Sequence, residues 1–276
     1  MDPITRPLII CAGAQKAGTS WLYKCLEEHK EICAADGKET NFFLSENKKS
    51  SEEYLNLFKQ CDNRPYLFEA SPLYLYELDT AHKILTKTSN AKVIIILRDP
   101  VERTISHFNH LKNTGVISKE LSLVEAVKGR PELLEHSRYK KYCEPYINQF
   151  PNTNILFLNF DDIKERPQEI INEVCRFCGV ETFTPRFLNK KYNSSNARSN
   201  KLYGTMTKLY IKLKNNFFGI QLLTLFRFLG IKSDILEKFL AKTSTEKPEQ
   251  SSIDVEFLRE TLQAESEFSN TLKYGN

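Results

Sequence analysis

The chain has 276 residues, of which 41% are hydrophobic and 27% are charged, a composition typical of a folded globular protein. Lysine and arginine number 39 against 35 aspartate and glutamate residues, so the net charge is +4. These values exclude a disordered tail protein and a fibrous repeat. So mild a basic excess suits an anionic ligand but does not indicate nucleic acid as a partner.

No apolar run reaches the length of about 18 residues that a transmembrane helix needs. Residues 1–12 lack the charged, apolar and cleavage regions of a secretory signal. The seven cysteines are odd in number and scattered, so we expect reduced thiols, no disulfide framework and a cytoplasmic location. Cys175 and Cys178 form one C-x-x-C pair without the second pair of a zinc ribbon, and we expect them to pack in the core.

The first half of the chain predicts two strand–helix units. Residues 8–12 form a short apolar run that ends at Gly13 and predicts a buried strand, with a helix over 19–30 after it. Residues 93–97 are all apolar and mostly β-branched, which is typical of a strand covered on both faces of a parallel sheet. A helix over 101–111 follows this strand.

A third unit comprises a strand over 154–159 and a helix over 167–178 that ends at Gly179. Alternating strands and helices predict an α/β fold, in which helices flank a parallel sheet. Because one sheet accommodates all three units, we expect 1–276 to be a single domain.

The C-terminal part has a different composition. Residues 201–242 carry eight lysines and arginines against two acidic residues, with apolar residues at helical spacing. We expect a basic helical elaboration over 201–250 and a closing helix over 253–276. Two interpretations of the basic segment are open: a peripheral contact with a membrane or anionic acceptor, and a solvated face of helices that pack on the core. The second is favoured.

The connection between the first strand and its helix contains the motif of a phosphate-binding loop. Gly13 and Gly18 are separated by four residues, and the helix that follows presents backbone N–H groups and a positive dipole end to an anion. A Walker A loop has lysine directly after the second glycine. Here Thr19 stands at that position and Lys16 lies inside the loop, which argues against a nucleotide kinase.

Three segments resemble the signatures of sulfotransferases that use 3′-phosphoadenosine 5′-phosphosulfate (PAPS) and have a P-loop-like fold. Residues 16–22 resemble the family's 5′-phosphosulfate loop, and residues 97–106 resemble its 3′-phosphate segment. Residues 38–43 are similar to a K-E-x-x-F-F stretch of bacterial and heparan-sulfate-type members. Residues 69–72 and 193–199 also resemble bacterial members.

The resemblance implies where PAPS would bind. The contacts would come from Lys16, Ala17, Gly18, Thr19, Ser20, Trp21, Arg98, Ser106 and Arg198. Arg98 and Ser106 would meet the 3′-phosphate, since a guanidinium grips phosphate with two parallel hydrogen bonds. Lys16 would neutralise charge on the leaving phosphate. Because Arg98 stands where a magnesium-binding aspartate would follow the strand, we expect a reaction without a metal.

Glu39 is the candidate general base, since the resemblance places it at the acidic base of heparan-type members. The alternative is a simple ion pair with Lys38. Some of these members have a lysine after the glutamate of an E-x-[ST]-P segment, and Ala70 stands there in this chain. Either Lys38 replaces that lysine or Lys16 acts alone.

The expected function is transfer of a sulfuryl group from PAPS to a hydroxyl or amine of a glycan or small metabolite. Two alternatives stay open at this point. One is a P-loop nucleotide kinase or other phosphotransferase, and the other is a non-catalytic protein that binds adenosine 3′,5′-bisphosphate (PAP). The sequence does not distinguish among acceptors.

Overall fold

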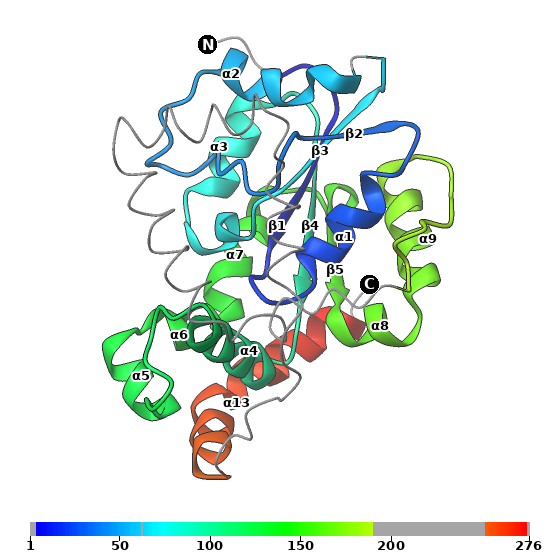
Figure 1. Ribbon diagram of the computed structural model, residues 1–276. Coiled ribbons are helices and arrows are strands. Elements are labelled where there is room, and N and C mark those ends of the chain that lie inside the picture. Colours follow the sequence, from blue (N-terminus) through cyan, green and yellow to red (C-terminus); the bar gives the residue numbers. More distant parts are fainter. Residues whose placement is uncertain (1–3, 62, 190–251, 275–276) are drawn as a thin grey trace. The chain divides into compact units, whose positions relative to one another are not determined.

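The computed structural model describes residues 4–61, 63–189 and 252–274 (Figure 1). Its contacts divide these residues into two compact units, and each is described by itself: the first has residues 4–103, 134–189 and 259–274, and the second has 104–133 and 252–258. The expected single domain therefore stays a prediction. The basic elaboration over 201–250 lies outside the described residues.

The first unit contains a five-stranded sheet. Its strands are β1 (Leu8–Gly13), β2 (Ile32–Ala34), β3 (Tyr66–Ala70), β4 (Ala91–Leu97) and β5 (Ile155–Asn159). They pair in the order β2-β3-β1-β4-β5, and every pair is parallel. The predicted α/β fold is confirmed. With β1 at the centre, the loops that leave β1, β3 and β4 emerge side by side at one edge.

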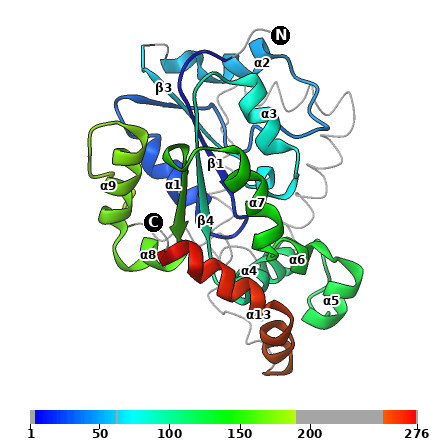
Figure 2. The same cartoon turned by 180° about the vertical axis from the view of Figure 1, so that it is seen from behind.

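The described helices are α1 (Thr19–Leu26), α2 (Ser51–Leu55), α3 (Thr80–Lys87), α4 (Pro100–Asn113), α5 (Leu123–Gly129), α6 (Glu132–Glu135), α7 (Tyr139–Gln149), α8 (Phe160–Glu165), α9 (Pro167–Cys178) and α13 (Ser252–Tyr274). Short 3₁₀ helices are η1 (Asn56–Cys61), η2 (Pro72–Tyr76) and η3 (Asn152–Asn154). In the first unit, α1 and α9 cover one face of the sheet, and α3 and α7 cover the other (Figures 1 and 2). None of the helices among the described residues has both the length and the apolar character to cross a membrane.

The predicted strands and helices are confirmed, with one shorter than expected. All six residues of β1 are buried, as a strand between two helical layers requires. The α1 helix ends at Leu26 instead of continuing to residue 30. There the chain turns to bury His29, whose Nε2 lies 2.8 Å from the carbonyl oxygen of Glu181 and whose Nδ1 accepts from the N–H of Glu31. The α9 helix has the predicted bounds.

The cysteines correct one prediction. Cys33 on β2 and Cys61 on η1 form a disulfide, with their Cα atoms 5.7 Å apart. The expectation of reduced thiols is wrong for this pair, because packing of η1 on β2 brings together two cysteines that are 28 residues apart in the sequence. The other five are free and buried, and they include Cys175 and Cys178, which pack in the core as predicted.

Candidate active site

The loop between β1 and α1 is shaped by its two glycines. Gly18 has a φ of 97°, in the left-handed region that side chains disfavour. A Cβ atom added there would lie 3.1 Å from the ring of Phe160. A Cβ atom on Gly13 would lie 2.8 Å from the Cβ of Leu75, which is too close for any real contact. Both positions therefore need glycine for close approach of the backbone to its neighbours.

The start of α1 presents backbone donors. In the part of the chain that the structure describes, the N–H groups of Gly18, Thr19 and Ser20 meet no acceptor, as is usual for a first helical turn. The N–H of Ala17 instead donates to the carbonyl oxygen of Ala14 at 3.2 Å. The loop thus offers the amides of Gly18, Thr19 and Ser20 to an anion.

Trp21 is held by two hydrogen bonds. Its side chain is buried, and the indole N–H donates to the carbonyl oxygen of Leu188 at 3.1 Å. Its backbone N–H donates to Gly18 at 2.9 Å. Neither N–H group is available to a phosphate while these bonds hold, so Trp21 fastens α1 to the segment after α9.

Lys16 lies among charged groups. Burial, together with the positive charges of Lys38 and Arg98, lowers the pKa of its ammonium to about 8, while the carboxylate of Glu39 acts in the opposite direction. These four residues follow β1, β2 and β4 in the sequence. The sheet topology brings them together because the carboxyl ends of parallel strands meet at one edge.

Arg98 directly follows β4, and its guanidinium is held on three sides. Nη1 donates to the carbonyl oxygen of Lys16 at 3.3 Å, and Nη2 lies 2.7 Å from a carboxylate oxygen of Glu102. The guanidinium carbon lies 4.7 Å from the ring centroid of Phe160. Its Nε is buried and has no hydrogen-bond partner among the described residues. A cationic donor in this position fits an anionic ligand.

The structure does not place the two remaining predicted phosphate contacts relative to this loop. Ser106 lies on α4 in the second unit, and its position relative to the loop is therefore not described. Arg198 lies outside the described residues. Arg103, near Ser106 in the sequence, is fully buried and donates through Nε to the hydroxyl of Ser137 at 2.5 Å, as a structural side chain does.

Glu39 follows β2 and is fixed through its backbone. Its N–H donates to the carbonyl oxygen of Ala70, at the end of β3, at 3.1 Å. A carboxylate oxygen lies 3.0 Å from the Nζ of Lys38, and about half of the Glu39 side chain (49%) is exposed against 19% for Lys38. The ion pair that formed the alternative interpretation is therefore present. It leaves the carboxylate accessible to an acceptor.

Sequence reasoning missed the carboxylate of Glu69. It is fully buried on β3 and accepts hydrogen bonds from four hydroxyls, those of Thr40, Tyr54, Ser71 and Tyr74. Burial raises its pKa, and the four donors oppose that rise. Its only signal in the sequence is its place as the glutamate of the E-x-[ST]-P segment. Three of its donors, Thr40, Tyr54 and Tyr74, are five or more residues away in the sequence.

This geometry defines an α/β protein with an anion-binding loop at the carboxyl edge of its sheet. The sulfotransferase domain family matches residues 6–215, more than half of the chain, and the chain belongs to this family. The match confirms the resemblance drawn from the motifs.

Two curated relatives and one solved structure illustrate the similarity. The membrane-associated sulfotransferase kil1 of Dictyostelium discoideum is 32% identical over 147 residues, which cover 49% of this chain and 31% of kil1. Heparan sulfate glucosamine 3-O-sulfotransferase 3B1 of Mus musculus is 25% identical over 187 residues, 63% of this chain and 46% of that protein. The chain therefore spans less than half the length of either relative.

The solved structure is a sulfotransferase from Alicyclobacillus acidocaldarius. It is 23% identical, has a TM-score of 0.61, and the alignment covers 82% of this chain and 96% of that one. At this identity the similarity supports the fold.

Proposed function

We propose that this chain transfers a sulfuryl group from PAPS to a hydroxyl or amine of a saccharide or small metabolite. The observation that carries the proposal is the convergence of Lys16, Lys38 and Arg98 with the free amides of α1 at one edge of the sheet. Membership of the sulfotransferase domain family supports the reaction class. The mouse relative is a glucosamine 3-O-sulfotransferase by name, which supports a saccharide as the acceptor.

The residues at this edge fit a highly anionic donor. The pKa of Lys16 is lowered partly because cations outnumber carboxylates around it, and the buried Nε of Arg98 has no partner among the described residues. A bound polyanion would relieve both conditions. PAPS would supply the activated sulfuryl group together with two phosphate sites for these cations.

The roles follow from position. Lys16, inside the loop, would neutralise negative charge on the leaving 5′-phosphate, and the amides of Gly18, Thr19 and Ser20 would orient it. Arg98, one strand away, would bind the 3′-phosphate through its fork of N–H donors. Catalysis of this kind depends on positioning and on charge neutralisation, as in phosphoryl transfer.

Glu39 would accept the proton of the acceptor group as the sulfuryl group arrives. Its carboxylate is half exposed at the same edge and close enough to raise the pKa of Lys16. Lys38 would supply the second cation, since the side chain at the alternative position, Ala70, is a buried methyl group. The contacts of Ser106 and Arg198 with PAPS stay proposals.

The cytoplasmic location is also a proposal. The disulfide between Cys33 and Cys61 weighs against it, because disulfides persist mainly in oxidising compartments.

The test is incubation of the chain with PAPS labelled in its sulfate group and an acceptor panel that includes desulfated heparan oligosaccharides. Mass spectrometry should find products heavier by one SO₃ group. Glu39→Gln should bind PAP normally and lose transfer. Glu27→Gln is the matched control, because Glu27 also forms a 3.0 Å ion pair with a nearby lysine, Lys24 on α1.

Two outcomes would favour the alternatives. Phosphate transfer that stops when EDTA removes magnesium would indicate a kinase. Binding of PAP without transfer to any acceptor in the panel would indicate a binding protein. Full transfer by Glu39→Gln would exclude Glu39 as the base while leaving the donor site intact.

A further inference from the structure

The buried carboxylate of Glu69 is surrounded by hydroxyl groups that donate hydrogen bonds to it. Its Oε2 accepts from Thr40 and, at 2.8 Å, from Ser71. Its Oε1 accepts from Tyr54 and Tyr74, each at 2.9 Å. While Glu69 is ionised its carboxylate only accepts, so the hydroxyls that bond to it direct their protons toward it. Their lone pairs are then left to accept from other groups.

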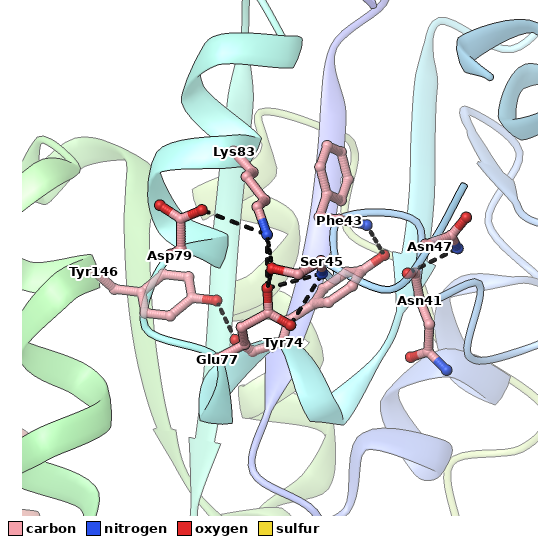
Figure 3. A network of polar contacts seen from close by, with 9 residues as sticks. All are labelled: Asn41, Phe43, Ser45, Asn47, Tyr74, Glu77, Asp79, Lys83 and Tyr146. Atoms are coloured by element: carbon pink, nitrogen blue, oxygen red, sulfur yellow. Dashed lines mark hydrogen bonds and ion pairs between the residues drawn. The ribbon is translucent and has the colours of Figure 1, made fainter. Parts of the chain in front are cut away.

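Those lone pairs hold the segment that contains Glu39. The N–H of Asn41 donates to the hydroxyl of Ser71 at 3.1 Å. The N–H of Phe43 donates to the hydroxyl of Tyr74 at 3.3 Å, a contact drawn in Figure 3. Thr40, between Glu39 and Asn41, is bound to Glu69 by its own side chain. Thr40 therefore contacts Glu69 directly, and Asn41 and Phe43 are linked to it through the hydroxyls of its partners.

The segment needs this support because its backbone is strained. Glu39 has a φ of 67° and Asn41 has a φ of 52°. A left-handed backbone costs a residue other than glycine about 1–2 kcal/mol, and it persists only where the surroundings impose it. Without the contacts around Thr40, the chain would relax toward right-handed or extended conformations and would carry the Glu39 carboxylate with it.

A second carboxylate, that of Glu77, holds the far end of the same loop but is only partly buried. Glu77 accepts from the N–H of Ser45 at 2.8 Å and forms an ion pair with Lys83 at 2.6 Å (Figure 3). A partly exposed pair of this kind contributes little, because water and salt screen it. The backbone geometry at Glu39 therefore rests on three sets of contacts: its N–H bond to Ala70, the bonds from the Asn47 amide to Thr40 and Asn41, and the buried contacts of Glu69.

We propose that Glu69 is a positioning residue, which keeps the carboxylate of Glu39 at the acceptor side of the site by orienting the hydroxyls of Thr40, Ser71 and Tyr74. The inference rests on the proposed role of Glu39 as the base. It assigns Glu69 no contact with PAPS or with the acceptor.

The experiment compares two buried tyrosine hydroxyls. Tyr74→Phe removes a 2.9 Å bond to Glu69 and the acceptor for Phe43. Tyr146→Phe is the matched control, since its hydroxyl is equally buried and donates at 2.9 Å to the carbonyl oxygen of Tyr74 rather than to Glu69 (Figure 3). Ser71→Ala is the second test variant, because it removes the acceptor for Asn41 without changing an aromatic ring.

Four quantities are measured: the melting temperature, PAP affinity by calorimetry, hydrogen exchange over residues 38–43, and kcat and KM with the best acceptor of the panel. Tyr74→Phe and Ser71→Ala should speed exchange in this segment and lower kcat roughly 10- to 100-fold, the scale of a misplaced catalytic group. Their PAP affinity should stay within about 2-fold of wild type, less than the tenfold that 1.4 kcal/mol represents. Tyr146→Phe should lower only the melting temperature.

If hydrogen exchange over 38–43 is unchanged in Ser71→Ala and Tyr74→Phe, the inference is overturned. This measurement does not require a sulfuryl acceptor to be known. Faster exchange with wild-type kcat, or an equal loss of kcat in Tyr146→Phe, would also overturn the inference. Failure of the proposed function is distinguishable, because the wild-type chain would then transfer no sulfuryl group to any acceptor of the panel. Full transfer by Glu39→Gln would instead remove the role of Glu39 on which the inference rests. Loss of transfer in Glu39→Gln with normal kcat in Ser71→Ala and Tyr74→Phe would sink only the role of Glu69.

Discussion

The guanidinium of Arg98 donates a hydrogen bond of 3.3 Å to the main-chain oxygen of Lys16. This bond joins the residue after β4 to the loop after β1, two strands that are neighbours in the sheet. It places two cations beside each other although 82 residues separate them in the sequence. Charges of the same sign repel each other, so such an arrangement favours a ligand that is negatively charged.

The first prediction concerns donor affinity. Lys16→Ala and Arg98→Ala should each weaken PAP binding by roughly 10- to 100-fold, because a hydrogen bond to a charged group is worth about 1.5–3 kcal/mol. Calorimetry with PAP measures this. Lys30→Ala is the control, since the exposed Lys30 pairs with Glu181 elsewhere on the surface. Wild-type affinity in both site variants would exclude the assigned donor site.

The second prediction concerns pH. Burial and neighbouring cations lower the pKa of Lys16 to about 8, so this ammonium loses its charge at a lower pH than an ordinary lysine. PAP affinity should therefore fall as the pH rises through about 8, while the phosphates, with a second pKa of about 6, stay charged. Lys16→Arg keeps a charge throughout and should abolish the fall. A fall of the same size in Lys16→Arg would assign it to another group.

The third prediction concerns the turn into α1. Gly18→Ala should lower stability by about 1–2 kcal/mol, because alanine strains at the left-handed φ of 97° and its Cβ meets the ring of Phe160. PAP binding should weaken as well, since that ring also lies against Arg98. Thermal unfolding and calorimetry test both effects. Gly129→Ala has nothing within 4 Å of the added atom and should show neither.

The fourth prediction concerns the disulfide. Cys61→Ser should lower the free energy of unfolding by roughly 3–4 kcal/mol, the loop-closure value for the 28-residue separation from Cys33. Denaturant titration with and without a reductant measures the loss. Cys11→Ser, at a buried free cysteine, is a control whose stability should not depend on reductant. If reductant leaves wild-type stability unchanged, the pair is reduced in solution.

The strongly periodic segments were predictable. The run over 93–97 and the helix over 167–178 have local causes: β-branched residues favour a strand, and Gly179, with its φ of 78°, ends the helix. The strand β2 was not predictable, because three residues are too short for a pattern. The strand β3 has one polar residue, Glu69, in a buried position, so it does not show the continuous apolar run of a central strand.

The candidate site divides in the same way. A glycine spacing and a lysine within the loop are local features, so an anion-binding role for residues 13–20 could be predicted from the sequence directly. The contact of Trp21 could not be predicted from the sequence, since its indole donates to Leu188, which lies 167 residues further along the chain. The roles of Glu69 and of the Cys33–Cys61 pair likewise depend on partners from other elements.

By itself, the sequence determined the family, the parallel sheet and the chemistry of the loop, because periodicity, glycine positions and short motifs act over a few neighbouring residues. The tertiary structure alone decided which charges meet. Parallel pairing in the order β2-β3-β1-β4-β5 aligns the carboxyl ends of the strands, and that alignment brings Lys16, Lys38, Glu39 and Arg98 to one edge. The same pairing buries Glu69 beneath the segment that carries Glu39.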